Sequence, residues 1–428
     1  MRVWTPRRLR FGPLEPWQRN QYAVVASVAL AFCAFELSNP FIPLYIRQLG
    51  VSDVNDAAFW AGMVSGITPL LAALMGPIWG VVADKYGRKS MVLRALVCIG
   101  IAQFLTAFVP NVYWLLGLRI VMGMFAGFTS MSMALAVSVS PRERMPQTIG
   151  LIQAAQIAPS AIGPLIGGPL ADLLGQSTTF MITGMLLLLP ISLIAIVLKE
   201  TPVTPSPSKQ TEKKPSVGGS IWSLMILPGF GAAVAILFLA RFGERAIQPI
   251  VPLYLIELQT PSAQLGTITG VAVAGGAIAA TLSSLLYGRW ANPGTIRRVL
   301  VLALSASAVC AGLFALARGW PEVVGLRLLI GLLAGGTISL AYTMGARLAP
   351  ADRSATTMSL LASWGMLGNA TSPLMAGVIG QNIGLRAVFV MTACGYLLAV
   401  SLLAVPALRE YLGVRRQARA QTADAEST

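Results

Sequence analysis

Apolar residues run along this chain in twelve long stretches that are separated by short polar segments. A membrane-spanning helix needs about 20 predominantly apolar residues. The alternating ten-residue pattern of barrel strands is absent, and a helix satisfies its own backbone hydrogen bonds in lipid. The pattern therefore predicts an all-α integral membrane protein with twelve transmembrane helices, at approximately residues 20–46, 57–83, 90–109, 111–139, 145–172, 178–198, 222–256, 262–288, 299–317, 320–346, 354–382 and 385–407.

The two halves of the chain repeat each other. Residues 40–45 (PFIPLY) reappear 209 positions later as residues 249–254 (PIVPLY), and the segment around Arg119 returns around Arg327. Duplication of an apolar chain is typical of transporters built from two repeats, which place a binding site between them. We therefore expect two pseudo-symmetric six-helix bundles around a central cavity.

A short segment of different composition joins the halves. Residues 199–221 are rich in Pro, Ser, Thr and Lys, so they have little apolar surface to bury and predict a mobile linker. The expected organisation is an N-terminal bundle with its tail at 1–198, the linker, a C-terminal bundle at 222–407 and a tail at 408–428.

Basic residues are distributed unevenly between the two sides of the predicted helices. The chain has 31 Lys and Arg residues and a formal net charge of +15. With the N-terminus inside the cell, 24 of these residues fall on the inner side and three in outer loops, which is the bias that orients membrane proteins. We expect a multi-pass protein of the cell membrane with both termini in the cytoplasm and no nucleic-acid partner. The first apolar stretch is too long for a signal-peptide core, so we expect it to be retained.

The composition argues against several other classes of function. The four cysteines are single, and there is no histidine, so neither a metal site nor a His-based catalytic triad is indicated. No phosphate-binding loop of a nucleotide-driven pump is present. An enzyme would need a cluster of catalytic groups, and a sensor would need an appended domain. We expect a protein that is not an enzyme, has no cofactor and is a monomer in the lipid bilayer.

The loop after the second predicted helix carries a specific motif, which consists of Gly80, Asp84, Lys85, Gly87, Arg88 and Lys89. An acid among basic neighbours at a helix end is suited to a charge-assisted latch between moving helices, and Gly87 permits a tight turn. The motif resembles the most diagnostic element of the major facilitator superfamily. The resemblance implies that Asp84 and Arg88 stabilise the outward-facing state. The second half has Asn292 at the place of the acid, so the two halves are latched unequally.

Arg119 lies within the fourth predicted helix, in a segment similar to a second motif of this superfamily, where the arginine is associated with proton coupling. A charge at the centre of a membrane costs about 3 kcal/mol on insertion scales. Arg119 should therefore face the interior of the bundle and have a partner there. Bonding to helix-end carbonyl groups is the structural alternative, both for Arg119 and for its repeat Arg327.

The fifth predicted helix carries a third resemblance, to the superfamily's antiporter motif, which is characteristic of proton-driven exporters. The matching positions are Gly150, Pro159, Gly163, Pro164, Gly167 and Gly168, of which Pro159 replaces a glycine. The added proline should bend the helix further.

Two acidic residues lie inside the predicted helices. Glu36 has no basic residue in its own helix, and an acid in lipid is by default functional. Burial raises the affinity of a carboxyl group for a proton, so Glu36 is suited to exchange a proton for a cationic cargo. Glu244 lies between Arg241 and Arg245, so it either forms an ion pair within its own helix or takes part in coupling.

Adaptable apolar and amide side chains are expected to line the cavity, although each is equally suited to helix packing: Phe32, Phe35, Met122, Gln153, Gln156 and Gln248. Together these features predict a secondary active transporter that exports amphipathic or lipophilic small molecules, cationic ones among them, such as drugs and antibiotics, in exchange for protons. The alternative is a proton-coupled exporter of one metabolite, such as a sugar or amino acid derivative.

Overall fold

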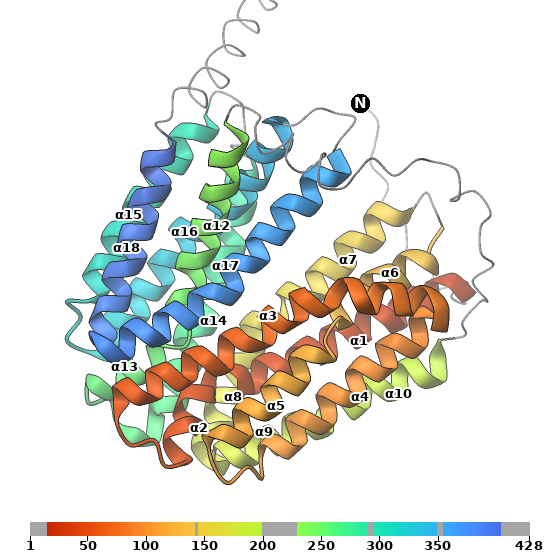
Figure 1. The fold of residues 1–428 in the computed structure, drawn as a ribbon, viewed down its shortest axis with the longest axis horizontal. Coiled ribbons are helices and arrows are strands. Elements are labelled where there is room, and N and C mark those ends of the chain that lie inside the picture. The colour runs from red at the N-terminus through yellow and green to blue at the C-terminus, as the bar shows by residue number, and fades with distance from the viewer. Residues whose placement is uncertain (1–14, 142–143, 199–228, 290–294, 349–353, 404–428) are drawn as a thin grey trace, which may run out of the picture.

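A computed structural model describes residues 15–141, 144–198, 229–289, 295–348 and 354–403 of the chain (Figure 1). These residues are helical throughout and contain no strand. Ten of their helical segments are long and apolar enough to cross a membrane, and residues 230–257 and 354–382 complete a set of twelve. The prediction of an all-α protein with twelve transmembrane segments is confirmed. The expected linker at 199–221 and the C-terminal tail at 408–428 lie outside the described residues.

The first half of the chain folds as one bundle (Figure 1). Its helices, with a short 3-10 turn η1 (Asn39–Phe41) after the first, are α1 (Pro16–Ser38), α2 (Ile42–Gln48), α3 (Val54–Tyr86), α4 (Arg88–Thr106), α5 (Val112–Met124), α6 (Phe128–Ser138), α7 (Met145–Ile157), α8 (Pro159–Leu174), α9 (Gln176–Leu186) and α10 (Leu188–Val197). Four of its expected transmembrane helices are divided along their length, between α1 and α2, α5 and α6, α7 and α8, and α9 and α10.

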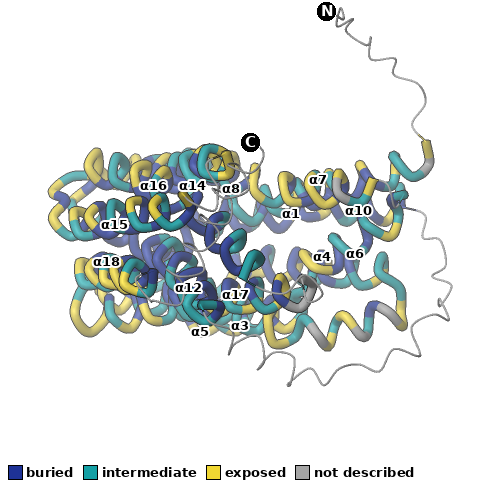
Figure 2. The backbone as a smooth tube through the Cα atoms, turned by 90° about the horizontal axis from the view of Figure 1, so that it is seen from above, coloured by how far each residue is buried: buried dark blue, intermediate teal, exposed yellow. Residues whose placement is uncertain are grey.

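The second half forms the other bundle, and the two bundles lie side by side with buried residues gathered inside each (Figure 2). Its helices are α12 (Phe230–Ala246), α13 (Val251–Glu257), α14 (Leu265–Arg289), α15 (Ile296–Phe314), α16 (Trp320–Leu348), α17 (Ser354–Asn382) and α18 (Leu385–Leu402), with the 3-10 turn η4 (Ser262–Gln264) before α14.

Local sequence signals fix several helix ends. The Asp53 side chain accepts hydrogen bonds from the backbone N–H groups of Asn55 and Asp56, at 2.8 and 2.9 Å, and so caps α3. Gly87 ends the same helix with φ of 90°, a conformation that glycine adopts without steric strain. The fourth transmembrane segment breaks at Gly127, whose φ is 121°.

The repeat in the sequence is also a repeat of contacts. The Tyr45 hydroxyl donates to the carbonyl of Thr106 at 2.7 Å, and its ring lies 4.9 Å from the ring of Phe180. In the second half, the Tyr254 hydroxyl donates to the carbonyl of Phe314 at 3.0 Å. The Tyr254 ring lies 4.9 Å from that of Phe389, 209 positions after Phe180. Each bundle is therefore held by an equivalent tyrosine that joins three of its helices.

The two bundles meet at one end and diverge toward the other (Figure 1). The first half of α3 packs tightly on α17. A Cβ atom added at Gly66 would lie 2.6 Å from Leu374 Cγ, and one added at Gly62 would meet the backbone of Pro373 and Gly377. Toward the other end of α3, Gly76 has no neighbour within 4 Å of an added Cβ atom. The glycines of this helix therefore do not act as one packing face: those near Val54 hold the bundles together, and those near Tyr86 face open space.

An acid closes the contact between the bundles. Asp172, near the end of α8, accepts hydrogen bonds from the backbone N–H groups of Gly266 and Thr267, both at 2.7 Å, and from the Thr267 hydroxyl at 2.6 Å. Its carboxylate thus caps the first turn of α14, where the helix dipole favours a negative charge. Gln381 donates to Asp56 at 3.0 Å at the same end of the molecule.

Candidate functional site

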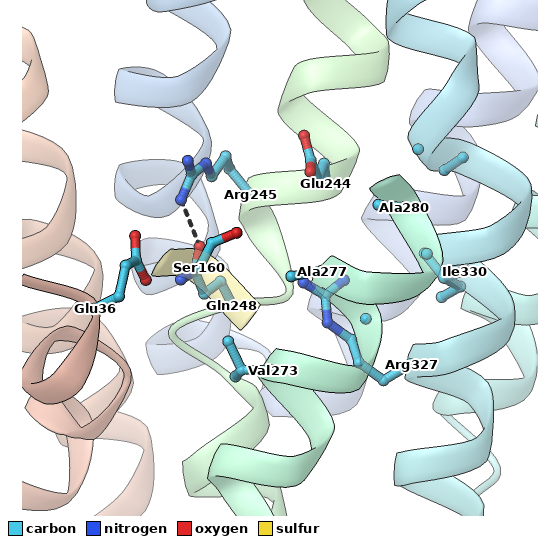
Figure 3. Close-up of a pocket in the computed structure, with 14 residues that line it drawn as sticks. Glu36, Ser160, Glu244, Arg245, Gln248, Val273, Ala277, Ala280, Arg327 and Ile330 are labelled. Atoms are coloured by element: carbon cyan, nitrogen blue, oxygen red, sulfur yellow. Dashed lines mark hydrogen bonds between the residues drawn. The ribbon is translucent and has the colours of Figure 1, made fainter. Parts of the chain in front are cut away.

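A cavity of about 100 Å³ lies between the two bundles (Figure 3). The first half contributes Glu36 from α1 and Ser160 from α8, and the second half contributes residues of α12, α14, α16 and the turn after α12. The lining from the second half is Glu244, Arg245, Gln248, Val273, Gly276, Ala277, Ala280, Arg327, Ile330, Gly331, Ala334 and Gly335. The site that the repeat predicts between the halves therefore coincides with a real cavity.

Glu36 reaches into this cavity from the first half (Figure 3). It lies on α1 against α8, where a Cβ atom at Gly163 would be 2.6 Å from the Cβ of Glu36. Across the cavity, Arg245 is close enough to interact electrostatically with the Glu36 carboxylate. Glu36 thus faces the cavity, and the basic group of Arg245 in the opposite half lies across the cavity from it.

Glu244 has a partner on its own helix. Arg241 Nη1 lies 3.4 Å from Glu244 Oε2, so the ion pair that the sequence left open as an alternative is formed. Arg245 Nη1 donates to Gln248 Oε1 at 2.7 Å, which holds the arginine at the cavity wall. The end of α12 therefore presents to the cavity Glu244, which is paired with Arg241, and Arg245, which Gln248 holds in place.

Arg119 is buried, with 3% of its surface exposed, and does not line the cavity. The hydroxyl of Thr68, on α3, donates to the Arg119 backbone carbonyl at 3.1 Å. Among the described residues, Arg119 Nε and Nη2 have no hydrogen-bond partner. The expected burial is present, whereas a partner for these two guanidinium nitrogens is not found there.

The residues of the loop motif make contacts inside the first bundle. Arg88 donates to the carbonyl of Ala134 on α6 at 3.1 Å, and Lys89 donates to the carbonyl of Leu198, after α10, at 2.6 Å. Lys85 is exposed with its ammonium 5.3 Å from the Tyr86 ring centroid, and Gly80 has no neighbour within 4 Å of an added Cβ atom. The side chain of Asp84 lies outside the described part of the structure.

The glycines of the span-five motif lie at the closest helix contacts around Glu36. Gly163 and Gly167 both face α1, since an added Cβ atom would meet Glu36 at the first and Leu37 at the second. Gly168 faces α14 across the bundle interface, where an added Cβ atom would be 2.6 Å from the Gly266 carbonyl oxygen. The carbonyl of Pro164 approaches Gly270 in the same way. These small residues bring α8 against both the acid-bearing helix and the opposite half.

The two remaining motif positions differ in their surroundings. Pro159 is the first residue of α8, so the expected bend takes the form of a division between α7 and α8. Gly150 has no neighbour within 4 Å of an added Cβ atom, so close packing does not require a glycine there.

Only one of the six expected lining side chains, Gln248, lies at this cavity. Phe32 and Phe35 pack against the core of the first bundle, and Met122 is within that core at 1% exposure, because its helix position turns it away from the opposite half. Gln153 is exposed and is not part of the cavity lining, and Gln156 is partly buried with its amide nitrogen unpartnered among the described residues.

Several polar groups in and near the contact between the bundles are not predicted from the sequence. Arg245 was considered only as a partner of Glu244, Arg327 only as a repeat of Arg119, and Ser160 and Asp172 were not singled out. The signal that could have found them is a charge within an apolar stretch, which is rare in lipid and marks a polar interior surface. Within the described ranges, no group of three or more acids and cysteines is placed to hold a metal ion.

Comparisons with known proteins agree with this architecture. The family model described as Major Facilitator Superfamily matches residues 24–237 and again residues 233–426. A multi-drug resistance efflux pump PmrA homolog of Lactococcus lactis is 30% identical over 88% of this chain and 92% of its own length. The multidrug resistance protein MdtG of Escherichia fergusonii is 29% identical over the same shares. A crystal structure of a bacterial homolog to the human lysosomal transporter Spinster shares the fold, with a TM-score of 0.73, 16% identity and coverage of 94% and 98% of the two chains.

Proposed function

The chain belongs to the major facilitator superfamily, and we propose that it exports amphipathic or lipophilic small molecules, drugs among them, in exchange for protons. Relatives that match 88% of the chain carry names of multidrug efflux pumps, which supports drug-like cargo. The observation that carries the proposal is the cavity between the halves, in which Glu36 faces polar groups of the opposite bundle. We take the protein to be a transporter without catalytic activity or cofactor.

Transport proceeds by rocking of the two bundles about the cavity. The contacts of Asp172 with α14 and of α3 with α17 close one end, while the bundles diverge at the end of Tyr86 and Ser354 (Figure 1). The uneven distribution of basic residues supports an open end that faces the cytoplasm, with both termini on the cytoplasmic side of the membrane. In this orientation the cavity accepts cargo from the cytoplasm. A single chain contains both halves of the cavity, so a monomer suffices.

Glu36 couples the two fluxes in this proposal. An ionised Glu36 attracts a cationic cargo group, and a protonated Glu36 does not, so proton and cargo compete for one carboxyl group. Arg245 lies across the cavity from Glu36 and adds a polar group of the second bundle to the same site. Glu244 is already paired with Arg241 and takes a secondary part. Arg119 acts at a distance, through the packing of α5 against α3.

The loop motif at residues 80–89 serves as a second latch, at the end of the molecule opposite to the Asp172 contact. Arg88 and Lys89 tie the start of α4 to α6 and α10, so this loop moves with the first bundle as one unit. Asp84, by its resemblance to the family motif, then stabilises the outward-facing state when the open end closes. The cycle alternates between this latch and the Asp172 cap.

Expression in an efflux-deficient bacterium tests the proposal. Cells should accumulate less of several chemically unrelated dyes and antibiotics than a vector control, and a protonophore should abolish the difference. Dependence on sodium instead of the proton gradient would contradict proton coupling. Resistance to one compound class only, with export of a single metabolite, would favour the narrow exporter over a multidrug pump.

A further inference from the structure

We propose that the cavity contains an anion subsite centred on Arg327, which binds a carboxylate group of the cargo. The inference rests on the proposed export function and deepens it, because it names a chemical group that the cargo carries. Arg327 lies on α16 in the second bundle and reaches into the cavity from the side opposite Glu36 (Figure 3).

Arg327 is a buried cation with unmet bonding capacity. Only 8% of its surface is exposed, and its Nε has no hydrogen-bond partner among the described residues. A guanidinium group carries five N–H donors in a planar fork that matches a carboxylate. Holding such a group at the wall of a cavity costs free energy unless a negative group compensates for it there. The compensation is therefore expected from a bound anion.

The acids around the cavity are already engaged. Glu244 is near enough to Arg327 for electrostatic interaction, but its carboxylate pairs with Arg241 at 3.4 Å. Glu36 faces Arg245 instead. Arg245 and Arg327 thus line the cavity together with Glu36 and Glu244, and the second of these acids is paired with Arg241, which lies outside the lining. The surplus is positive, and it lies in the second bundle.

A missing side chain gives the Arg327 guanidinium room beside α14. Gly276 on α14 faces Arg327, and a Cβ atom there would lie 3.1 Å from Arg327 Nε and 3.4 Å from Cζ. In the first bundle the position 208 residues earlier is Thr68, and the equivalent Arg119 is absent from the cavity lining. The two repeats therefore differ here, because a glycine adjoins the arginine that lines the cavity and a threonine stands at the corresponding place beside the one that does not.

The remaining wall suits a flat apolar body. Ala277, Ala280 and Ala334 line the cavity beside Arg327 with small side chains. A cargo that carries a carboxylate on an aromatic or aliphatic frame can place its acid at Arg327 while its other end, basic or apolar, extends toward Glu36. A free inorganic anion offers the same charge to Arg327 but no body to fill this wall.

A matched pair of dyes tests the subsite in transport. The probes are a rhodamine with a free carboxyl group and its methyl ester, which differ only at that group. In cells that express the wild-type protein we expect efflux of both. Arg327→Gln and Gly276→Ala should each slow efflux of the free acid by about tenfold or more and slow efflux of the ester much less, since one bidentate ion pair is lost or blocked. Gly325→Ala, on the same helix as Arg327 and without close neighbours, is the control and should behave as wild type.

Binding to the purified protein separates the sources of the anion and the two levels of the proposal. Benzoate should displace the bound acid dye, whereas chloride and inorganic phosphate at equal concentration should not. Equal displacement by phosphate, or equal loss of both dyes in Gly276→Ala, would overturn the carboxylate subsite. Absence of dye efflux together with wild-type binding that depends on Arg327 would instead contradict the export function and keep the subsite.

Discussion

Gly163 lies so close to Glu36 that a Cβ atom added to the glycine would sit 2.6 Å from the Cβ of the acid. The span-five motif and the acid of the first helix, 127 positions apart in the chain, are therefore parts of one packing contact. Bare backbone at Gly163 lets α8 support α1 where Glu36 turns into the cavity. This contact gives the motif a structural reason: it fixes the direction of the acid.

Replacement of Gly163 by alanine should misplace Glu36. Overpacking of this kind costs about 1–3 kcal/mol, so α1 must move or the helices must separate. We expect efflux to fall about tenfold or more, while the protein still reaches the membrane. Gly150→Ala is the matched control, since the same motif has open space there. Dye efflux from cells measures both variants, and equal activity of the two would show that the close contact is not needed.

Asp172→Asn should loosen the closed end. The carboxylate accepts three hydrogen bonds from the first turn of α14, and an amide oxygen replaces them only in part. Bonds to a charged acceptor contribute about 1.5–3 kcal/mol each when buried and less at a half-exposed site. We expect the population to shift by about tenfold toward the outward-facing state. Spin-label distances across the closed end should lengthen, and Asp56→Asn, which loses one exposed bond, should change them less.

Asp84→Asn should shift the population in the opposite direction from Asp172→Asn. Its motif predicts a latch that holds the outward-facing state, so the variant should favour the inward-facing one. The same spin-label pair should report shorter distances across the end that Asp172 closes. If Asp84→Asn and Asp172→Asn moved the distances in the same direction, the two acids would not be opposing latches.

The two repeated tyrosines should contribute to stability in parallel. Tyr45→Phe leaves the carbonyl of Thr106 without its 2.7 Å hydrogen bond, and Tyr254→Phe removes one hydroxyl donor that is shared between the carbonyls of Phe314 and Ala317 at 3.0 and 3.1 Å. Loss of one such donor costs about 0.5–1.5 kcal/mol. We expect both variants to unfold at a lower temperature in detergent, by similar amounts, and to keep transport activity. A loss of transport at unchanged stability would assign these tyrosines to the mechanism instead.

The membrane segments could be predicted because lipid imposes a simple rule on apolar length. The expected span at residues 354–382 has the bounds of α17, and α16 exceeds its expected span by two residues. The division of the fourth segment at Gly127 was not predicted. Trp79, on another helix, donates to the Met124 carbonyl at 2.7 Å at this break, and such a tertiary contact leaves no mark on the local apolar pattern.

Only some of the residues of the cavity could be predicted from the sequence. Glu36 stood out because an acid without a basic neighbour is costly in lipid. Which groups face it across the cavity depends on how the two bundles tilt, and Arg245 comes from a helix more than 200 positions away. Met122 shows the converse: its residue type suits a cavity, but the turn of its helix directs it into the core.

Proton release upon cargo binding tests the central claim most directly. When a lipophilic cation is added to purified protein in weakly buffered detergent solution, it binds the ionised form of Glu36. Those molecules in which Glu36 is protonated must therefore give up that proton to bind the cation, so the solution should become more acidic. Glu36→Gln should abolish this release, and Glu244→Gln, in which the acid is already paired with Arg241, should retain it. Release of the same size from Glu36→Gln would contradict the account and place the proton elsewhere.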